Sequence, residues 1–417
     1  MTLAFRLAEQ VERDWLTETL AALVRIPSVT GEEDAAQEWM AETLKDLGGE
    51  VDAWRVDAEA LKGRPGFPGA RILTPRQNVV ATFAGTDAGP TLVLNGHIDT
   101  VSAGDEARWT HPPFAATLVG DRLYGRGAAD MKGGLTAILG AVRAIRKAGI
   151  GLKGTVQVQS VVGEEDGGLG AFAAIERGHR GDAVIVCEPT EMAVVPAHAG
   201  VTLFRITVSG RAAHGCVRAE GVSAFEKFLP VHAALVELEA ERNRRLRHPL
   251  YEGMALPWPL SIGIVQAGIW PAIVPERLVA EGRIGVALGE RIEDVRRQVE
   301  EAVRRAASAD PWLTQHVPTV EWVGGVWQST ETSTAHPLVE TLKRAVGEVV
   351  GRPPVVRGAT YGSDLRLFTN DFGIPGVLFG PGDIRQAHFT DESVSIAEVE
   401  TASLALARTI VEYCGVA

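Results

Sequence analysis

The sequence has few of the features that mark secreted, membrane or nucleic-acid-binding proteins. Its three cysteines, Cys187, Cys216 and Cys414, are odd in number and lack metal-type spacing. This usage favours a reducing compartment and argues against a disulfide framework. The N-terminal residues lack the basic stretch and apolar block of a signal peptide, and no apolar run approaches the roughly 18 residues that span a bilayer. We therefore expect a soluble, cytoplasmic protein that makes no membrane contact.

An excess of positive charge is also missing. The formal net charge is −12 and the isoelectric point is near 5.4, which argues against nucleic acid as a partner. Hydrophobic residues make up 46% of the chain and charged residues 23%, as in ordinary globular proteins. A chain of 417 residues is long enough for two or three domains.

Between residues 91 and 190, short apolar runs alternate with helical patterns. The runs TLVLN, VQVQSVV and AVIVC lead to His97, Glu164 and Glu188, and a helix is predicted over 132–148. Strands that alternate with helices indicate a largely parallel sheet, whose ligand sites gather at the carboxyl ends of the strands. Before this region, Thr30 and Glu33 have the spacing of a helix cap.

Near residue 200 the pattern changes to β-α-β-β-α, with helices predicted over 222–247 and 290–308. After residue 312 the chain returns to helix, strand, helix. We therefore predict an α/β fold with two domains: a discontinuous catalytic domain, 1–198 and 313–417, and an inserted α+β domain, 199–312.

Acidic and histidine residues recur at the predicted strand ends. Imidazole nitrogen and carboxylate oxygen are the ligands of zinc and similar divalent ions. One bridging carboxylate with two histidines and two glutamates would hold two cations about 3.5 Å apart. A further glutamate would then be free as a general base, and an aspartate could orient a ligand imidazole. The residues concerned are His97, Asp99, Asp130, Glu164, Glu165, Glu188 and His388.

Each of these residues has a simpler explanation when taken alone. His97 could be a structural histidine after a strand, and Asp130 could cap a glycine-rich turn. The acids of GEEDGG (163–168) could be solvated, and Glu188 could begin a helix. Their recurrence at several strand ends of one α/β pattern favours a common site. Asp166, the third acid of GEEDGG, has no predicted chemistry.

Six motifs occur in a fixed order over nearly the whole chain: LNGHIDTVSAGD (94–105), LYGRGAADMKGG (123–134), VVGEEDGGLG (161–170), VCEPT (186–190), RAAHG (211–215) and FGPGDIRQAHFTDESV (379–394). Together they resemble the zinc-dependent acetylornithine deacetylase, succinyl-diaminopimelate desuccinylase and aminoacylase family, which includes carboxypeptidase G. The resemblance implies a catalytic domain with a mixed, mostly parallel sheet between helices. It also implies an inserted lid domain with a four-stranded sheet, through which the family usually forms homodimers.

The resemblance implies a ligand set for two divalent ions, with zinc expected and cobalt or manganese as alternatives. His97, Asp130 and Glu188 would bind one ion, and Asp130, Glu165 and His388 would bind the other. Glu164 resembles the general base for attack by metal-bound hydroxide on an amide carbonyl. Asp99 resembles the partner of the ligand histidine.

Three residues outside the ligand set also match the family. His214 matches a histidine that enters the partner subunit's active site and stabilises the oxyanion, although by sequence alone it reads as a turn histidine. Arg283 matches an arginine that pairs with a substrate carboxylate, and a surface arginine is an equal alternative. Thr360 lies in a stretch similar in kind to the family's substrate loop. The chain departs from the family at Ala272, where many members have an amide nearby, and at Asp391, where asparagine is common.

The resemblance favours removal of an acyl group from nitrogen, because members that act on ureido groups usually have histidine at the position of Glu188. We expect a hydrolase of the amide C–N bond in an N-acylated amino acid or related small molecule. The alternatives are a dipeptidase or carboxypeptidase, a specialised non-peptide C–N hydrolase, and a non-catalytic relative that binds metal or ligand. Glu164 argues against the last, because a binding protein needs no base.

Overall fold

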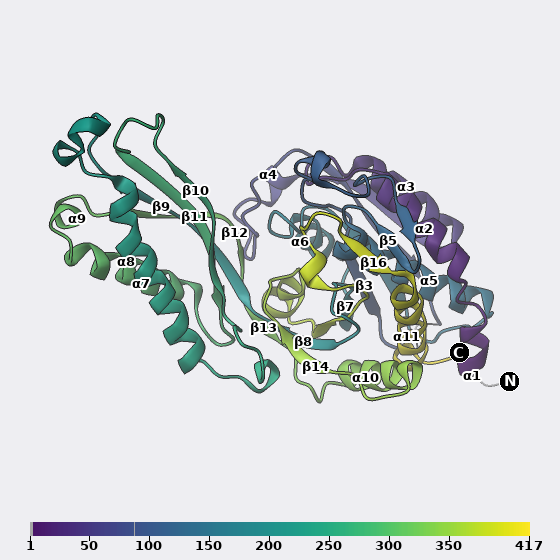
Figure 1. The fold of residues 1–417 in the computed structure, drawn as a ribbon. Coiled ribbons are helices and arrows are strands. Elements are labelled where there is room, and N and C mark those ends of the chain that lie inside the picture. Colours follow the sequence, from purple (N-terminus) through teal and green to yellow (C-terminus); the bar gives the residue numbers. More distant parts are fainter. Residues whose placement is uncertain (1–2, 87) are drawn as a thin grey trace. The chain divides into compact units, whose positions relative to one another are not determined.

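The computed structural model describes residues 3–86 and 88–417, and within it the chain forms two compact units (Figure 1). The first unit comprises Met1–Ala197, Glu331–Arg357 and Ser363–Ala417. The second comprises His198–Thr330 and Gly358–Gly362. Each unit has its own hydrophobic core.

A nine-stranded mixed sheet forms the centre of the first unit. Its strands β6, β3, β7 and β15 run parallel to one another, so their carboxyl ends lie at one edge, whereas the flanking strands β2 and β8 pair antiparallel with β6 and β15. Apart from the partly exposed Gln157 of β6, the residues of these strands are buried, which explains their largely apolar sequences. The predicted mixed sheet is confirmed. In spatial order the strands are β1 (Glu50–Val56), β2 (Arg76–Phe83), β6 (Val156–Val161), β3 (Leu92–His97), β7 (Ala183–Val186), β15 (Gly376–Leu378), β8 (Val194–His198) and β13 (Thr330–Glu331), and β14 (Val356–Ala359) pairs with β8.

Helices cover this sheet. A row of mutually packed helices is formed by α10 (Pro337–Val350), α11 (Ile396–Cys414), α5 (Gly133–Lys147) and α2 (Arg13–Arg25). Helices α3 (Asp34–Asp46) and α6 (Leu169–Glu176) pack on strands β2 and β6. Helix α5 agrees with the helix predicted over 132–148. The first unit also contains the short helices α1 (Leu3–Ala8) and α4 (Ala58–Leu61) and a small sheet of β16 (Ser393–Ser395), β5 (Arg122–Tyr124) and β4 (Thr117–Val119).

The cap predicted at Thr30 does not form. Helix α3 begins at Asp34, and no side chain caps its first turn. The Thr30 hydroxyl instead donates to Asp99 Oδ2 at 3.0 Å, and Glu33 Oε1 lies 2.7 Å from Arg76 Nη1. Asp99 and Arg76 are both buried, and buried charged groups require partners. Thr30 and Glu33 therefore provide partners for buried charged groups and do not cap the helix.

The second unit contains the predicted four-stranded sheet. Its antiparallel strands are, in spatial order, β10 (Leu260–Ala267), β11 (Arg277–Val286), β9 (Gly200–Ser209) and β12 (Thr319–Trp327). Alternate residues of β9, including Phe204, Ile206 and Val208, are buried in a core with helices α7 (Ala224–Arg245) and α8 (Ile292–Ser308). A short helix, α9 (Pro311–Gln315), follows α8. Strand β12 lies beyond the expected boundary at residue 312, and the unit extends to Thr330 because β12 pairs with β9 along most of its length.

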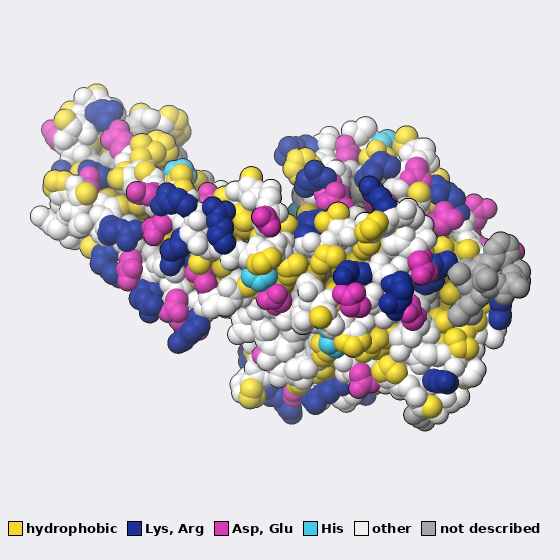
Figure 2. All heavy atoms as spheres, turned by 90° about the horizontal axis from the view of Figure 1, so that it is seen from below, with side chains coloured by type: hydrophobic (Ala, Val, Ile, Leu, Met, Phe, Trp, Pro, Cys, Tyr) yellow, Lys and Arg dark blue, Asp and Glu magenta, His cyan; other side chains and the backbone are white. Residues whose placement is uncertain are grey.

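The surface carries both signs of charge. Figure 2 shows Lys and Arg side chains interspersed with Asp and Glu on the face drawn. Cys187 and Cys414 are buried, Cys216 is exposed, and all three are free thiols. In the described part of the chain, none of the helices combines the length and apolar character required to cross a membrane.

Candidate metal centre

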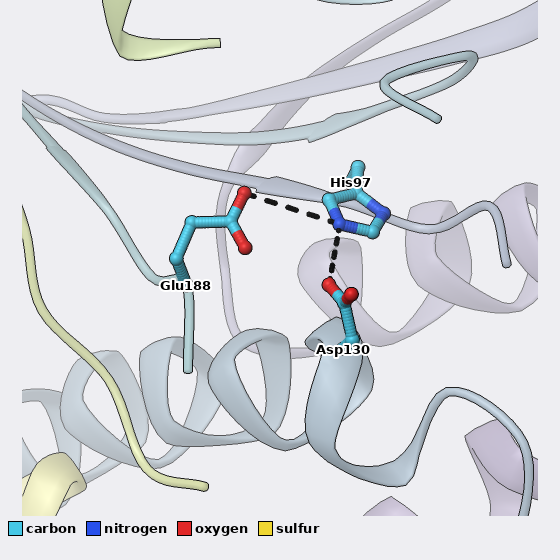
Figure 3. Close-up of side chains that lie close together, drawn as sticks. All are labelled: His97, Asp130 and Glu188. Carbon is cyan, nitrogen blue, oxygen red and sulfur yellow. Dashed lines mark hydrogen bonds and ion pairs between the residues drawn. The ribbon is translucent and has the colours of Figure 1, made fainter. Parts of the chain in front are cut away.

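Three buried side chains meet at the carboxyl edge of the central strands. His97 is the last residue of β3, Glu188 follows β7, and Asp130 lies in the irregular helical segment before α5. His97 Nε2 lies 3.1 Å from Asp130 Oδ1 and 4.0 Å from Glu188 Oε1. Figure 3 shows both carboxylates pointing towards the imidazole. This group could hold one metal ion.

A second group shares Asp130 with the first. His388 Nε2 lies 3.0 Å from Glu165 Oε1 and 3.5 Å from Asp130 Oδ2. The two carboxylate oxygens of Asp130 thus face different histidines. The His388 side chain is 53% exposed, whereas that of His97 is 1% exposed, so the centre opens to solvent on the His388 side. The structure brings all five predicted ligands together.

The donor atoms at His97 fit a divalent cation. His97 Nδ1 lies 2.9 Å from the backbone oxygen of Asp99, which can only accept, so Nδ1 carries the proton. In the neutral imidazole the lone pair on Nε2 then faces the carboxylates of Asp130 and Glu188. A proton on Nε2 or a metal ion between the groups removes the repulsion between this lone pair and the carboxylates. Burial lowers the pKa of His97, but its hydrogen bond to Asp130 and the charges of the nearby acids outweigh this effect and raise the pKa. Holding Nδ1 on a backbone acceptor is typical of ligand histidines.

The centre has an excess of buried negative charge. Burial, with the nearby charge of Asp364, raises the pKa of Glu164 well above its usual value. Burial likewise raises the pKa of Glu188. Burial lowers the pKa of His388, but hydrogen bonds to Asp130 and Glu165 outweigh it and raise the pKa to about 11. Bound cations would offset this charge, which is what the ligand set requires.

Asp99 contacts both His97 and the turn that follows β6. The contact to His97 Nδ1 comes from its backbone oxygen, and the nearer carboxylate oxygen lies 3.7 Å away. The buried carboxylate instead accepts the backbone N–H groups of Glu164 and Glu165, at 3.1 and 3.2 Å. Asp99 therefore fixes the turn that carries the predicted base and one ligand, as well as the histidine.

The GEEDGG turn gives its three acids different surroundings. Glu165 faces His388, whereas the Glu164 carboxylate makes no hydrogen bond or ion pair with any described residue. Asp166 Oδ2 accepts the backbone N–H groups of Arg71 and Ile72, each at 2.7 Å, and so anchors the loop before β2. Asp166 thus has a structural contact that the sequence did not indicate. Gly168 has φ +90°, and a Cβ there would lie 2.2 Å from Asp364 Oδ1, which explains the glycine.

Sequence reasoning missed several groups around the centre. Asp364 is buried behind the turn, and Arg366 donates from Nη2 to the Gly167 oxygen at 2.7 Å. Glu392 is buried beside Asp130. The sequence offered Ser363-Asp364 in a polar loop and an acid four residues after His388. Neither pattern indicates which side chains turn towards the interior.

The remaining predicted residues lie in the second unit. His214 pairs with Ile273 in a short antiparallel bridge, and its Nδ1 lies 3.0 Å from Cys216 Sγ. Arg283 Nη2 donates to the Thr360 oxygen at 3.2 Å, so these two residues adjoin. The predicted substrate and oxyanion roles of these three residues stay predictions.

Comparisons with known proteins agree with this geometry. The model of peptidase family M20/M25/M40 matches residues 93–412. A deformylase of N-formyl-4-amino-5-aminomethyl-2-methylpyrimidine from Halalkalibacterium halodurans is 32% identical over 404 residues, covering 91% of this chain and 89% of its own. The enzyme of the same name from Bacillus subtilis is 29% identical over 405 residues, with the same shares covered. The structure of human carnosine dipeptidase 1 matches with a TM-score of 0.80 and 17% identity over 99% of each chain, which shows a common fold. The chain therefore belongs to peptidase family M20/M25/M40 and is a metal-dependent hydrolase of amide C–N bonds.

Proposed function

We propose that the chain removes a formyl or other short acyl group from the amine nitrogen of a small molecule, using two divalent ions. The observation that carries this proposal is Asp130, whose two oxygens face His97 in one group and His388 in the other. A carboxylate shared in this way is the arrangement required by two-ion sites. The oxygen and nitrogen donors suit zinc, with cobalt or manganese as alternatives.

Glu164 and Asp99 have different roles in the proposed reaction. Two divalent ions, when bound, polarise the substrate carbonyl and make coordinated water more acidic. Glu164 takes a proton from the attacking water and delivers it to the leaving nitrogen, because its carboxylate is buried beside the ligands and is not held by another group. Asp99 keeps Glu164 in place through its backbone N–H.

The acyl-removal proposal is also supported by the two deformylase relatives, which match over nearly the whole chain. We expect the purified enzyme, supplied with divalent metal, to hydrolyse N-formyl-4-amino-5-aminomethyl-2-methylpyrimidine faster than N-acetyl-ornithine, N-succinyl-diaminopimelate or a dipeptide. Release of formate, acetate, succinate or free amino acid measures each reaction. A kcat/KM that is highest for the dipeptide would contradict acyl removal and support a peptidase.

We propose further that the enzyme is a homodimer formed through the second unit. Helix α7 exposes Phe225, Leu229 and Val236 along one stripe, and β10 is the edge strand of its sheet, with Ile264 and Val265 exposed. Exposed apolar side chains of this kind mark interfaces, and an edge strand readily pairs with a second chain. His214 of one subunit would then serve the active site of its partner.

Replacing His214 with alanine is expected to lower kcat on the order of 10²-fold, because a donor to the developing oxyanion is lost. If the donor comes from the partner, mixing inactive His214→Ala and Glu164→Ala chains should restore about a quarter of wild-type activity, since half of the dimers contain one complete site. Subunit exchange followed by activity assay measures this. Failure of exchanged heterodimers to regain activity would place His214 in its own subunit's site, or outside the reaction.

We propose that the protein is cytoplasmic, because its cysteines are free thiols. Cys187, Cys216 and Cys414 are all free, and Cys216 is exposed, which suits a reducing compartment. Fractionation of cells that produce the native protein tests the location, and recovery outside the cytoplasm would contradict it.

A further inference from the structure

Glu392 is a buried carboxylate to which the reaction assigns no part. It lies four residues after His388 and directly before β16, and its side chain is 1% exposed. A buried charge is costly unless it is paired and hydrogen-bonded. Its partners therefore indicate its purpose.

All partners of the Glu392 carboxylate lie in one segment, residues 126–130. Oε2 accepts from Arg126 Nη1 at 2.7 Å and from the Gly127 backbone N–H at 2.9 Å. Oε1 accepts from the backbone N–H groups of Ala129 at 2.9 Å and Asp130 at 3.0 Å. Both oxygens are thus occupied by the chain that carries the ligand Asp130.

The backbone of this segment is irregular at the ligand itself. Asp130 has φ −121° and ψ 93°, and Met131 has φ −132° and ψ 36°, so neither has helical geometry. N–H groups at the start of a helical segment lack partners within the helix. Glu392 supplies the missing acceptors for the backbone N–H groups of Gly127, Ala129 and Asp130. These hydrogen bonds hold the backbone from which the Asp130 side chain extends, and so they restrain the position and direction of that side chain.

We propose that Glu392 is a positioning residue that holds Asp130, the carboxylate shared by both metal groups, in the orientation that binds two divalent ions. The inference rests on the proposed two-ion function. Glu392 also connects two of the predicted ligands. Its carboxylate accepts from the Asp130 backbone N–H, and only three residues separate it from His388 in the sequence. Groups that hold ligands in this way typically change metal affinity or activity 10- to 100-fold when replaced.

The second unit contains a matched control. Glu290 accepts from the guanidinium of Arg242, at 3.1 and 2.7 Å, and from the Ala287 backbone N–H at 3.0 Å. Arg242 is buried, as is Arg126. Glu290→Gln therefore removes a carboxylate with similar partners that belongs to neither metal group.

The experiment compares wild type, Glu392→Gln and Glu290→Gln as full-length, metal-free proteins. Each is titrated with Zn²⁺ against a chromogenic chelator and with Co²⁺ by visible absorption, and thermal unfolding without metal is recorded. We expect Glu392→Gln to bind Zn²⁺ about 10- to 100-fold more weakly and to show an altered Co²⁺ spectrum at saturation, because an amide cannot accept from four donors. Glu290→Gln is expected to unfold at a lower temperature while keeping wild-type affinity and spectrum.

The outcomes separate this inference from the proposed function. If wild type binds two Zn²⁺ ions and Glu392→Gln has the same Zn²⁺ affinity and Co²⁺ spectrum as wild type, the positioning role is overturned and the proposed function stands. Failure of wild type to bind two ions would overturn the proposed function and this inference with it. Should Glu392→Gln not fold, Glu392→Asp takes its place, since the shorter side chain cannot reach all four donors; weaker binding supports the role and unchanged binding overturns it.

Discussion

Replacing Glu164 with glutamine is expected to lower kcat about 10³-fold while the protein keeps its bound metal. General acid–base groups contribute roughly 10²- to 10⁴-fold, and glutamine has nearly the shape of glutamate but cannot take up a proton. The Glu164 carboxylate belongs to neither metal group, so its loss leaves the ligands intact. Steady-state kinetics on the preferred substrate, with metal analysis of the same sample, measures both effects.

The control for this experiment lies in the same turn. Asp166→Asn changes a carboxylate two residues away whose contacts are the backbone N–H groups of Arg71 and Ile72. Asparagine retains an oxygen that can accept these bonds, so kcat is expected to stay within about threefold of wild type. Near-normal turnover by Glu164→Gln would remove Glu164 as the base, and loss of metal from that variant would make it a ligand instead.

Replacing Asp130 with alanine is expected to abolish binding of both metal ions and to lower activity on the order of 10⁴-fold or more. Asp130 is the one residue common to the two groups, whereas Glu188 and Glu165 each belong to a single group. Removing the shared carboxylate also removes the negative charge between two cations, so each remaining site is weakened by repulsion as well as by a lost ligand.

Glu188→Ala provides the comparison for Asp130→Ala. It takes one ligand from the group of His97 and leaves the group of Glu165 and His388 complete. Metal analysis after dialysis is expected to give close to two ions for wild type, about one for Glu188→Ala and close to none for Asp130→Ala. Equal metal content in the two variants would contradict a shared ligand, and circular dichroism of each confirms that the fold is retained.

The types of side chain and their order along the sequence were enough to predict the central sheet, the metal-ligand set and the family. The alternation of apolar runs with helical patterns predicted a largely parallel sheet, because burial on both faces requires continuous apolar strands, and the family resemblance implied that the sheet is mixed. His97, Glu165 and Glu188 stand at or just after strand ends, and parallel strands bring their carboxyl ends to one edge. The ligand set could therefore be proposed from sequence, and the fold and family are confirmed.

Only the tertiary structure decided what surrounds those ligands. Thr30 and Glu33 have the spacing of a helix cap, yet they contact the buried groups Asp99 and Arg76. Glu392 and Asp364 resemble ordinary loop acids, but the first holds the backbone of Asp130. Local propensity is weak, at most about 1–2 kcal/mol for a cap, and an unpaired buried charge costs more. The partners of a buried charge depend on how segments far apart in the sequence pack together. A local sequence pattern contains no information about that packing.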